Sequence, residues 1–278
     1  MLEYICAARL GLRGRIRKMA KKIAVITGAS GGIGKRFAET VERAGSFDEV
    51  WVIARRPDRL EALKDKVPFP VRALALDLTD RASFDTYAAL LESEQPEVGV
   101  LINCSGFGKF CATTDVPLSE NLNMVDLNCQ ALMAMCQLSL PYMKKGGHII
   151  NIASVAAYQP IPYINVYAAS KAFVLSYSRA LAREVKNSGI TVCAVCPFWT
   201  KTEFFNRSVV TDKNGGTVVK KYVAMYTPEQ IVERAWRDAL KGRDMSRYGF
   251  KAIAQGILTK LLPHSLVMNV WQSQQKLK

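Results

Sequence analysis

The sequence lacks several features that define specialised classes of protein. It has no run of about 18 uncharged apolar residues, so we expect no membrane-spanning helix. Internal repeats and low-complexity linkers are also absent. A chain of 278 residues, with 49% hydrophobic and 22% charged residues, is therefore predicted to fold as one globular domain. Its seven cysteines lack the close spacing of a disulfide scaffold, and several lie in apolar runs, which favours a cytoplasmic protein.

Cys193 and Cys196 form a C-x-x-C pair, a spacing used by redox and metal sites. They lie, however, in the run Ile190–Cys196, which has the pattern of a strand. Two residues three positions apart on a strand point to opposite faces of the sheet. We therefore predict no metal site and no redox-active dithiol.

Basic charge is concentrated at the two ends of the chain. The net charge is +14, but the segment 23–200 is neutral, with seventeen basic and seventeen acidic residues. A nucleic-acid-binding enzyme would spread basic charge over its working domain, so we expect no nucleic-acid partner. Solvated ends explain most of the excess. The alternative is a surface that attracts acidic substrates, phosphates or anionic lipid.

Residues 1–18 are predicted to be a basic extension that the domain can dispense with. Arg13, Arg15, Arg17 and Lys18 follow the apolar stretch of this segment, which reverses the order of a signal peptide. An Arg-rich transit peptide is the alternative. Met19 stands just before the first expected strand, so the domain is taken as residues 19–278.

Short runs rich in Val and Ile alternate with longer segments of helical periodicity. We expect strands at Ile23–Thr27, Val50–Ala54, Val71–Leu76, Val100–Asn103, His148–Ile152 and Thr191–Cys196. Helices are expected at Gly34–Ala44, Pro57–Lys66, Arg81–Ser93, Leu118–Met143 and Tyr167–Asn187. Such alternation predicts an α/β fold: a single-domain, Rossmann-like, doubly wound parallel sheet with helices on both faces.

The last third of the sequence has a looser pattern. We expect residues 198–226 to form a substrate loop or short helical lid. Thr227 is predicted to cap the next helix, with Pro228 in its first turn and Gln230 completing a capping box. The apolar and basic segment 249–278 is expected to cap the substrate cleft or contact another subunit. Contact with a membrane surface is the less economical alternative.

The first strand leads directly into a glycine-rich turn and a helix, with the spacing Gly28-x-x-x-Gly32-x-Gly34. These parts form an anion site, because a pyrophosphate can approach backbone N–H groups at the positive end of the helix. No Gly-Lys-Ser/Thr follows, which excludes a P-loop. A purely structural glycine turn is the alternative.

An acidic residue is absent about 20 residues beyond this turn, where Rossmann enzymes bind the ribose 2′-hydroxyl of NAD. The sequence there reads Ala54-Arg55-Arg56-Pro57. Guanidinium groups pair with a 2′-phosphate through charge-assisted hydrogen bonds. An arginine at a helix start is otherwise poorly placed beside the positive dipole. We therefore predict NADP(H) as the cofactor, with Arg55 as a ligand.

Tyr167 and Lys171 are four residues apart in a helical pattern, so their side chains share one helix face. Ser154 follows the expected strand His148–Ile152 and lies at the carboxyl end of the sheet, where α/β proteins bind ligands. A hydroxyl, a phenol and an ammonium group are therefore expected to meet in one catalytic site.

These motifs together resemble the short-chain dehydrogenase/reductase family, of the NADP-preferring type. The resemblance covers about residues 20–205 and rests on the glycine turn, Asn103, Asn128, Ser154, Tyr167-x-x-x-Lys171 and Pro197, in register. It implies that Tyr167 is the general acid in reduction and the general base in oxidation, with its pKa lowered by Lys171. Ser154 would hold the substrate carbonyl, and Asn128 would support a water relay to the lysine.

The resemblance also implies further cofactor contacts. They are Ser30 and Ile33 in the turn, Asp77 and Leu78 as an adenine-binding pair, Asn103 and Gly106 at a strand end, Pro197, and Thr202 at the nicotinamide carboxamide. The sequence departs from the family pattern at Phe198, where a glycine usually follows the proline. We therefore expect different local contacts near the nicotinamide.

Aromatic residues surround the expected reaction centre, and no anchoring charge stands beside it. We expect Tyr158, Tyr163, Phe198, Trp199 and Phe204 to contact an apolar ketone or secondary alcohol, such as a steroid, fatty or aryl carbonyl. The alternative is that these rings pack against one another. The resulting hypothesis is an NADP-dependent, hydroxysteroid dehydrogenase-like carbonyl reductase that acts on CH–OH groups and forms a dimer or tetramer. The alternatives are a non-catalytic nucleotide-binding regulator and a lipid carbonyl reductase associated with a membrane surface.

Overall fold

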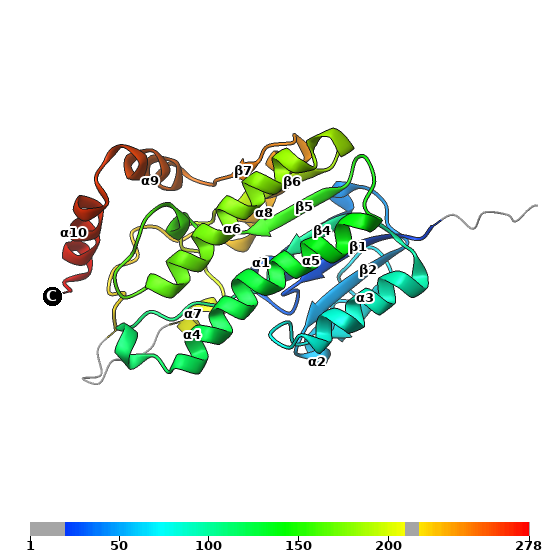
Figure 1. Ribbon diagram of the computed structural model, residues 1–278, viewed down its shortest axis with the longest axis horizontal. Coiled ribbons are helices and arrows are strands. Elements are labelled where there is room, and N and C mark those ends of the chain that lie inside the picture. The colour runs from blue at the N-terminus through cyan, green and yellow to red at the C-terminus, as the bar shows by residue number, and fades with distance from the viewer. Residues whose placement is uncertain (1–19, 209–216, 278) are drawn as a thin grey trace, which may run out of the picture.

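A computed structural model describes residues 20–208 and 217–277, which form a parallel sheet covered by helices (Figure 1). The sheet has seven strands in the order β3-β2-β1-β4-β5-β6-β7. The strands are β1 (Lys22–Thr27), β2 (Glu49–Ala54), β3 (Val71–Ala75), β4 (Glu97–Asn103), β5 (His148–Ile152), β6 (Thr191–Val195) and β7 (Met245–Ser246). The predicted doubly wound, Rossmann-like fold is confirmed, with β7 as an additional strand.

Helices cover both faces of this sheet. One face carries α1 (Gly32–Glu39), α2 (Pro57–Glu61) and α8 (Pro228–Leu240), and the other carries α3 (Ala82–Glu94), α5 (Ala131–Ser139) and α6 (Asn165–Glu184). The remaining helices are α4 (Leu118–Val125), α7 (Phe204–Ser208), α9 (Phe250–Leu261) and α10 (His264–Gln275). Figure 1 shows α9 and α10 together at one end of the molecule, beyond the start of α6.

The central strands are buried on both faces, which explains why they are almost continuously apolar. In β1, Ala24 and Ile26 belong to the core under α1 and α8, whereas Ile23 and Val25 belong to the core under α3, α5 and α6. Cys193 and Cys196 also divide between these two cores, so the prediction that they point to opposite faces is confirmed.

Three expected helices differ from those observed. The segment expected to be one helix, Leu118–Met143, is broken by a π-helical turn at Asp126–Gln130 and ends in a 3₁₀ turn at Leu140–Tyr142. The helix expected to reach Ala44 ends at Glu39, where Thr40 bonds the carbonyl of Arg36 and accepts from the Trp236 indole of α8. α2 ends at Glu61 rather than Lys66. The capping box at Thr227 is confirmed, because its side chain and that of Gln230 cap each other's backbone N–H groups.

Some predictions concern residues that the structure does not describe. The basic extension 1–18 lies outside the described residues, as does the part of the expected substrate loop at 209–216. Within the described residues, no helix is both long and apolar enough to cross a membrane. The same residues contain no group of three or more His, Cys, Asp or Glu side chains placed to hold a metal ion.

Candidate active site

A large cavity opens at the carboxyl ends of the strands. Strand order reverses between β1 and β4, and the loops after these strands diverge there, as at the ligand sites of other doubly wound sheets. The cavity has a volume of about 1080 Å³. Its walls include Gly28, residues 30–33, 54–56, 76–78, 104–107 and 152–156, Tyr167, Lys171 and residues 197–200. The structure thus brings together most of the residues predicted to bind cofactor or substrate.

The turn after β1 requires glycine for two steric reasons. Gly28 has a φ of +67°, and a Cβ there would lie 2.7 Å from the backbone nitrogen of Ser105 in the loop after β4. A Cβ at Gly34 would lie 2.3 Å from the carbonyl oxygen of Gly28. Gly34 itself does not line the cavity and instead allows the helix to pack on the turn. The two glycines therefore hold the start of α1 close to the loop after β4, with the cavity in front.

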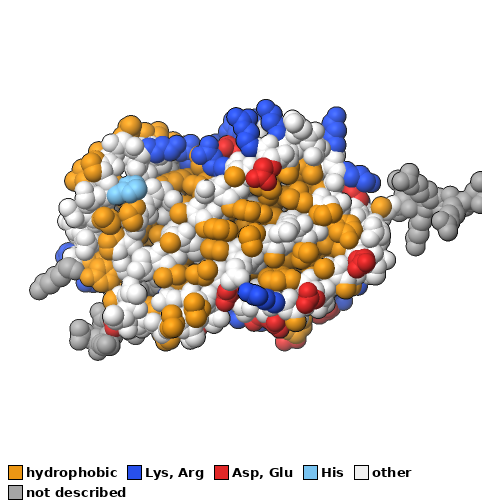
Figure 2. Space-filling view, in the orientation of Figure 1, with side chains coloured by type: hydrophobic (Ala, Val, Ile, Leu, Met, Phe, Trp, Pro, Cys, Tyr) orange, Lys and Arg blue, Asp and Glu red, His pale blue; other side chains and the backbone are white. Residues whose placement is uncertain are grey.

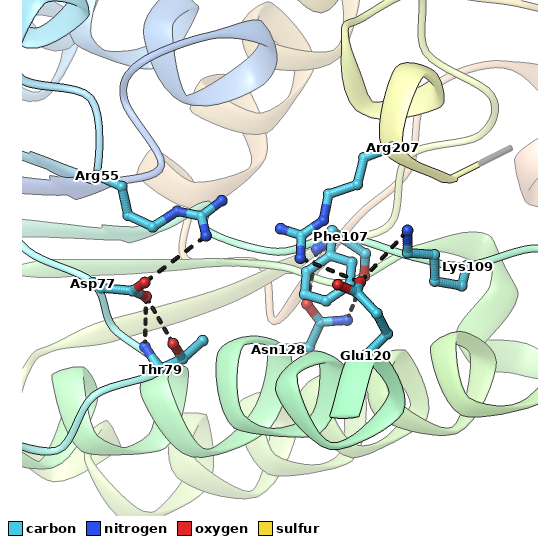
Figure 3. Close-up of polar contacts among 8 residues, drawn as sticks. All are labelled: Arg55, Asp77, Thr79, Phe107, Lys109, Glu120, Asn128 and Arg207. Atoms are coloured by element: carbon cyan, nitrogen blue, oxygen red, sulfur yellow. Dashed lines mark hydrogen bonds and ion pairs between the residues drawn. The ribbon is translucent and has the colours of Figure 1, made fainter. Parts of the chain in front are cut away.

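Three arginines stand at the end of the cavity formed by β2 and α2. Arg55 lies 3.8 Å from the Asp77 carboxylate, as Figure 3 shows, and Arg56 donates to the Ser30 hydroxyl at 3.1 Å. Arg59 donates to Glu203 at 2.6 Å, and Arg56 lies 3.7 Å from the same carboxylate. Hydrogen bonding and charge from Arg59 and Arg56 hold the pKa of Glu203 below its usual value. This end of the cavity is thus a basic site that one carboxylate already contacts.

Ser154, Tyr167 and Lys171 meet at the centre of the cavity. Tyr167 and Lys171 come from the first two turns of α6, and Ser154 follows β5. Lys171 donates to the carbonyl oxygen of Ile152 at 2.7 Å, and its ammonium lies 5.8 Å from the centre of the Tyr167 ring. The Ser154 hydroxyl accepts from the N–H of Ala156 at 3.1 Å and also bonds the Tyr167 hydroxyl. A phenol, its hydroxyl partner and an ammonium group therefore face one space.

Burial dominates the acid–base properties of this centre. It raises the pKa of Tyr167 to about 12, although the hydrogen bond to Ser154 lowers it in part. Burial also lowers the pKa of Lys171 to about 8. The pKa of Tyr167 is therefore raised and not lowered as expected, because desolvation is its largest cause. At neutral pH the phenol keeps its proton, which it loses only as the pH rises through its raised pKa.

Asn128 connects the loop after β4 to α6. Its side chain accepts from the N–H of Phe107 at 3.0 Å, donates to the carbonyl of Phe107 at 2.9 Å and donates to the Ser170 hydroxyl at 2.9 Å. Figure 3 shows these two hydrogen bonds between the Asn128 side chain and the backbone of Phe107. A Cβ at Gly106 would lie 2.8 Å from Asn128 Oδ1 and 3.4 Å from Lys171 Nζ. Asn128 therefore holds the loop after β4 beside Lys171. It lies in the π-helical turn Asp126–Gln130, which contains one more residue than an α-helical turn.

Five predicted site residues are absent from the cavity walls. Gly34 and Asn128 act through the contacts described above, and the other three are Asn103, Tyr158 and Tyr163. The buried side chain of Asn103 turns into the sheet core and donates to Asn151 at 2.9 Å, so it supports the strand end rather than facing the cofactor. The Tyr158 hydroxyl donates to the Met245 sulfur at 3.7 Å, and Tyr163 packs against the hydrophobic cluster that includes Ile161 and Ile164. The expectation that the two tyrosines line the substrate site is therefore not met among the described residues. Phe198, Trp199, Phe204 and Thr202 do line the cavity.

The substrate end of the cavity includes residues that sequence reasoning missed. Phe110 is buried, and its ring centre lies 5.9 Å from that of Tyr167 and 6.0 Å from that of Trp199. In the sequence, only its position seven residues after the strand end at Asn103 indicated that Phe110 could lie near the site. The apolar wall is completed by Phe250 and Leu258 of α9, by Leu262 directly after it, and by Val270 and Trp271 of α10.

Two polar anchors hold this wall in place. The Trp271 indole donates to the carbonyl of Pro162 at 3.1 Å, and the buried Gln275 accepts from the N–H groups of Lys220 and Lys221. Another cavity residue, Arg207 of α7, places its guanidinium 3.5 Å from the centre of the Phe107 ring and 3.4 Å from Glu120 of α4 (Figure 3). The wall from α9 and α10 and the Arg207 side chain are therefore both fixed to the body of the fold.

Comparisons with known proteins agree with this geometry. Residues 22–213 match the family described as short chain dehydrogenase. The chain is 32% identical over 219 residues to the NADP-dependent 3-hydroxy acid dehydrogenase of Salmonella typhi, covering 77% of this chain and 87% of that protein. It is 34% identical over 200 residues to the 3-ketodihydrosphingosine reductase of Bacteroides thetaiotaomicron, covering 71% of each.

Two further similarities extend to a longer relative and to a solved structure. The chain is 30% identical over 258 residues to a very-long-chain 3-oxoacyl-CoA reductase of Danio rerio, covering 88% of this chain and 78% of that protein. The short-chain dehydrogenase from Sphingobium yanoikuyae in complex with NADPH is 28% identical, with a TM-score of 0.69 over 81% of this chain and 87% of that chain.

Proposed function

The chain belongs to the short-chain dehydrogenase family of oxidoreductases, and we propose that it transfers a hydride between NADP(H) and an apolar ketone or secondary alcohol. The observation that carries this proposal is the convergence of Ser154, Tyr167 and Lys171 in one cavity with the glycine turn. A non-catalytic regulator would need the nucleotide site but not the serine, tyrosine and lysine together.

The residues of the cavity fit a nicotinamide dinucleotide. The turn leaves no room for a Cβ at Gly28, and Gly31 and Gly32 line the cavity at the start of α1, a position that suits a pyrophosphate. Asp77, Leu78, Pro197 and Thr202, which the family resemblance assigns to the cofactor, all line the cavity. When bound, NADP(H) supplies the hydride in reduction and accepts it in oxidation.

The chain's own residues carry the proton chemistry. In reduction, the Tyr167 hydroxyl donates its proton to the carbonyl oxygen as the hydride reaches the carbon, and in oxidation the phenolate takes a proton from the alcohol. The Ser154 hydroxyl donates to the same substrate oxygen and holds it within reach. Lys171, which donates to the carbonyl of Ile152, would hydrogen-bond the cofactor ribose and, when charged, would favour the phenolate. Burial raises the pKa of the phenol further above neutral pH, so Tyr167 carries the proton that reduction requires.

The preference for NADP(H) over NAD(H) rests on the arginines at the end of β2. Arg55 and Arg56 line the cavity where a 2′-phosphate would lie, and no acidic residue follows β2 directly. The similarity to a structure in complex with NADPH supports this assignment.

An extended apolar substrate fits the wall formed by Phe110, Trp199 and Phe204 together with α9 and α10. Two relatives bear names of reductases for long-chain carbonyl compounds, which favours a fatty carbonyl over a steroid or an aryl ketone. We further propose that the chain forms a homo-oligomer through α5 and α6, where Met133 and Phe173 are each 39% exposed and Figure 2 shows hydrophobic side chains facing the viewer.

A panel of fatty, steroid and aryl ketones, assayed with NADPH and with NADH, tests the proposed function. We expect turnover of long-chain ketones with NADPH, followed by the loss of absorbance of the reduced cofactor. Absence of turnover with every ketone and with the matching alcohols, while NADPH still binds, would favour the non-catalytic regulator. Turnover with NADH in preference to NADPH would reject the cofactor assignment alone.

Glu203→Gln is expected to tighten NADPH binding by about fivefold, since a carboxylate close to the cofactor phosphates is repelled by them. Its oxygen lies 3.8 Å from a Cβ placed at Gly31 in the turn, and the side chain is 56% exposed. The dissociation constant can be measured from NADPH fluorescence. Glu233→Gln, at a 59% exposed carboxylate of α8 away from the cavity, is the matched control and should change nothing. Weaker or unchanged binding in Glu203→Gln would show that this carboxylate does not oppose the cofactor.

A further inference from the structure

Helices α9 and α10 leave much of their apolar surface uncovered. On α9, residues 250, 257, 258 and 261 recur at the helical period and so share one face. Residues 266 and 270 on α10 are four positions apart and also share a face. The exposed fractions of these side chains are 81% for Phe250, 51% for Ile257, 51% for Leu258, 74% for Leu261, 46% for Leu266 and 48% for Val270. We call these six side chains the α9–α10 face.

Basic side chains border the α9–α10 face. The sequence from 245 to 277 contains four Lys or Arg residues and no Asp or Glu. Lys251 and Lys260 lie on α9 itself and are exposed. Arg247 comes within 2.9 Å of a Cβ placed at Gly256, so it lies directly beside the same helix. The charge next to this apolar surface therefore has one sign.

The basic border continues into a groove between α6 and α8. Arg179, Arg183, Lys186, Arg243 and Arg247 line this groove. Its acids are Asp238, paired with Arg234 and Arg243, and Asp244, paired with Arg179. Figure 2 shows Lys and Arg side chains along the upper edge of the molecule, beside the hydrophobic side chains of α9 at the upper left. Apolar and basic surfaces thus lie side by side along one edge.

We propose that the α9–α10 face and its basic border dock on an anionic lipid bilayer. Exposed apolar side chains of interfacial helices insert at the boundary between headgroups and acyl chains, and Lys and Arg beside them are attracted by anionic headgroups. A second copy of the chain is a poorer partner, because a symmetric contact would bring two basic borders together. The combination of apolar face and basic border is therefore complementary to lipid.

Docking would also place the cavity mouth at the lipid. Phe250, Leu258 and Val270 line the cavity and are at the same time exposed on the α9–α10 face. An apolar ketone would then pass from the bilayer to the site without crossing water. This route rests on the proposed function, whereas docking itself does not.

Flotation of the full-length protein with vesicles tests docking. We expect it to bind vesicles that contain phosphatidylserine, and to bind less as the salt concentration rises, because salt screens the headgroup charge. Leu261→Glu should lower the partition coefficient at least about tenfold by removing one inserted side chain. Leu261 does not line the cavity, so its replacement should leave ketone reduction in vesicle-free buffer unchanged. Leu118→Glu, at a leucine of α4 that is 73% exposed, is the matched control and should keep full vesicle binding.

Three outcomes would overturn the proposal. The first is failure of the wild-type protein to bind either phosphatidylserine or phosphatidylcholine vesicles. The second is equal binding by the wild type and Leu261→Glu, which would place the lipid contact elsewhere, for example on the basic residues 1–18. The third is dissociation of an oligomer by Leu261→Glu but not by Leu118→Glu, measured by light scattering, which would identify the face as a contact between copies. Vesicle binding without ketone turnover would reject only the proposed function, and turnover without vesicle binding would reject only docking.

Discussion

Tyr167→Phe is expected to lower the rate of ketone reduction by about three orders of magnitude, because phenylalanine has no proton to give to the carbonyl oxygen. The ring itself should stay in place, since it packs against Phe110 and Phe204 with ring centres 5.9 and 5.6 Å away. NADPH affinity should therefore be nearly unchanged. Steady-state rates with a ketone identified from the panel, together with NADPH fluorescence titration, measure the two effects separately.

Tyr158→Phe provides the matched control. It removes a tyrosine hydroxyl near the same loop, but this hydroxyl bonds the Met245 sulfur outside the cavity walls. Its rate should remain close to that of the wild type. Substantial turnover in Tyr167→Phe, or an equal loss in both variants, would mean that Tyr167 is not the proton donor.

Arg55→Ala is expected to weaken NADPH binding about tenfold while leaving NADH binding unchanged. A hydrogen bond between charged groups contributes on the order of 1.5–3 kcal/mol, and solvent exposure of this arginine, at 56%, places the effect at the low end. NADH lacks the 2′-phosphate, so the replacement removes no hydrogen bond from its complex. Titration of the protein with both cofactors gives the ratio of dissociation constants directly.

Arg179→Ala is the control for this measurement. Arg179 is 50% exposed and paired with Asp244, so it matches Arg55 in exposure and in having an acidic partner, but it lies away from the cavity. If Arg55→Ala weakened NADH as much as NADPH, the arginine would be supporting the site rather than recognising the phosphate. An unchanged NADPH affinity would remove Arg55 from the cofactor site altogether.

The edge strand β3 is only partly buried, whereas β1, β2, β4, β5 and β6 are buried on both faces and were predictable because each appears in the sequence as a short apolar run. β7 was not, because it comprises two residues, Met245 and Ser246. It exists because the N–H groups of Ala194 and Cys196 on β6 bond the carbonyls of Asp244 and Ser246. No periodic pattern can develop over so short a segment.

The interruption of the helix at Asp126–Gln130 was equally invisible in the sequence, since all its residues are compatible with an α-helix. The structure relates it to Asn128, which bonds the backbone of Phe107 and the Ser170 hydroxyl. Asn128 is separated in the sequence from Phe107 by 21 positions and from Ser170 by 42 positions. Local helix propensity therefore cannot predict these contacts.

The direction of each side chain was the least predictable property of the site. Asn103, Tyr158 and Tyr163 stand near the motifs in sequence, yet their side chains face the core or its edge. Phe110 and the wall from α9 and α10 carry no motif, yet they form much of the substrate end.

The sequence by itself determined the alternation of the first six strands with helices, the glycine turn, the spacing of Tyr167 and Lys171 and the absence of an acid after β2. Each depends on residues close together in the chain, where periodicity and steric limits act directly. Only the tertiary structure decided which side chains meet across the cavity. It also decided that burial, more than the neighbouring ammonium, sets the pKa of Tyr167, because desolvation depends on how distant segments pack around the phenol.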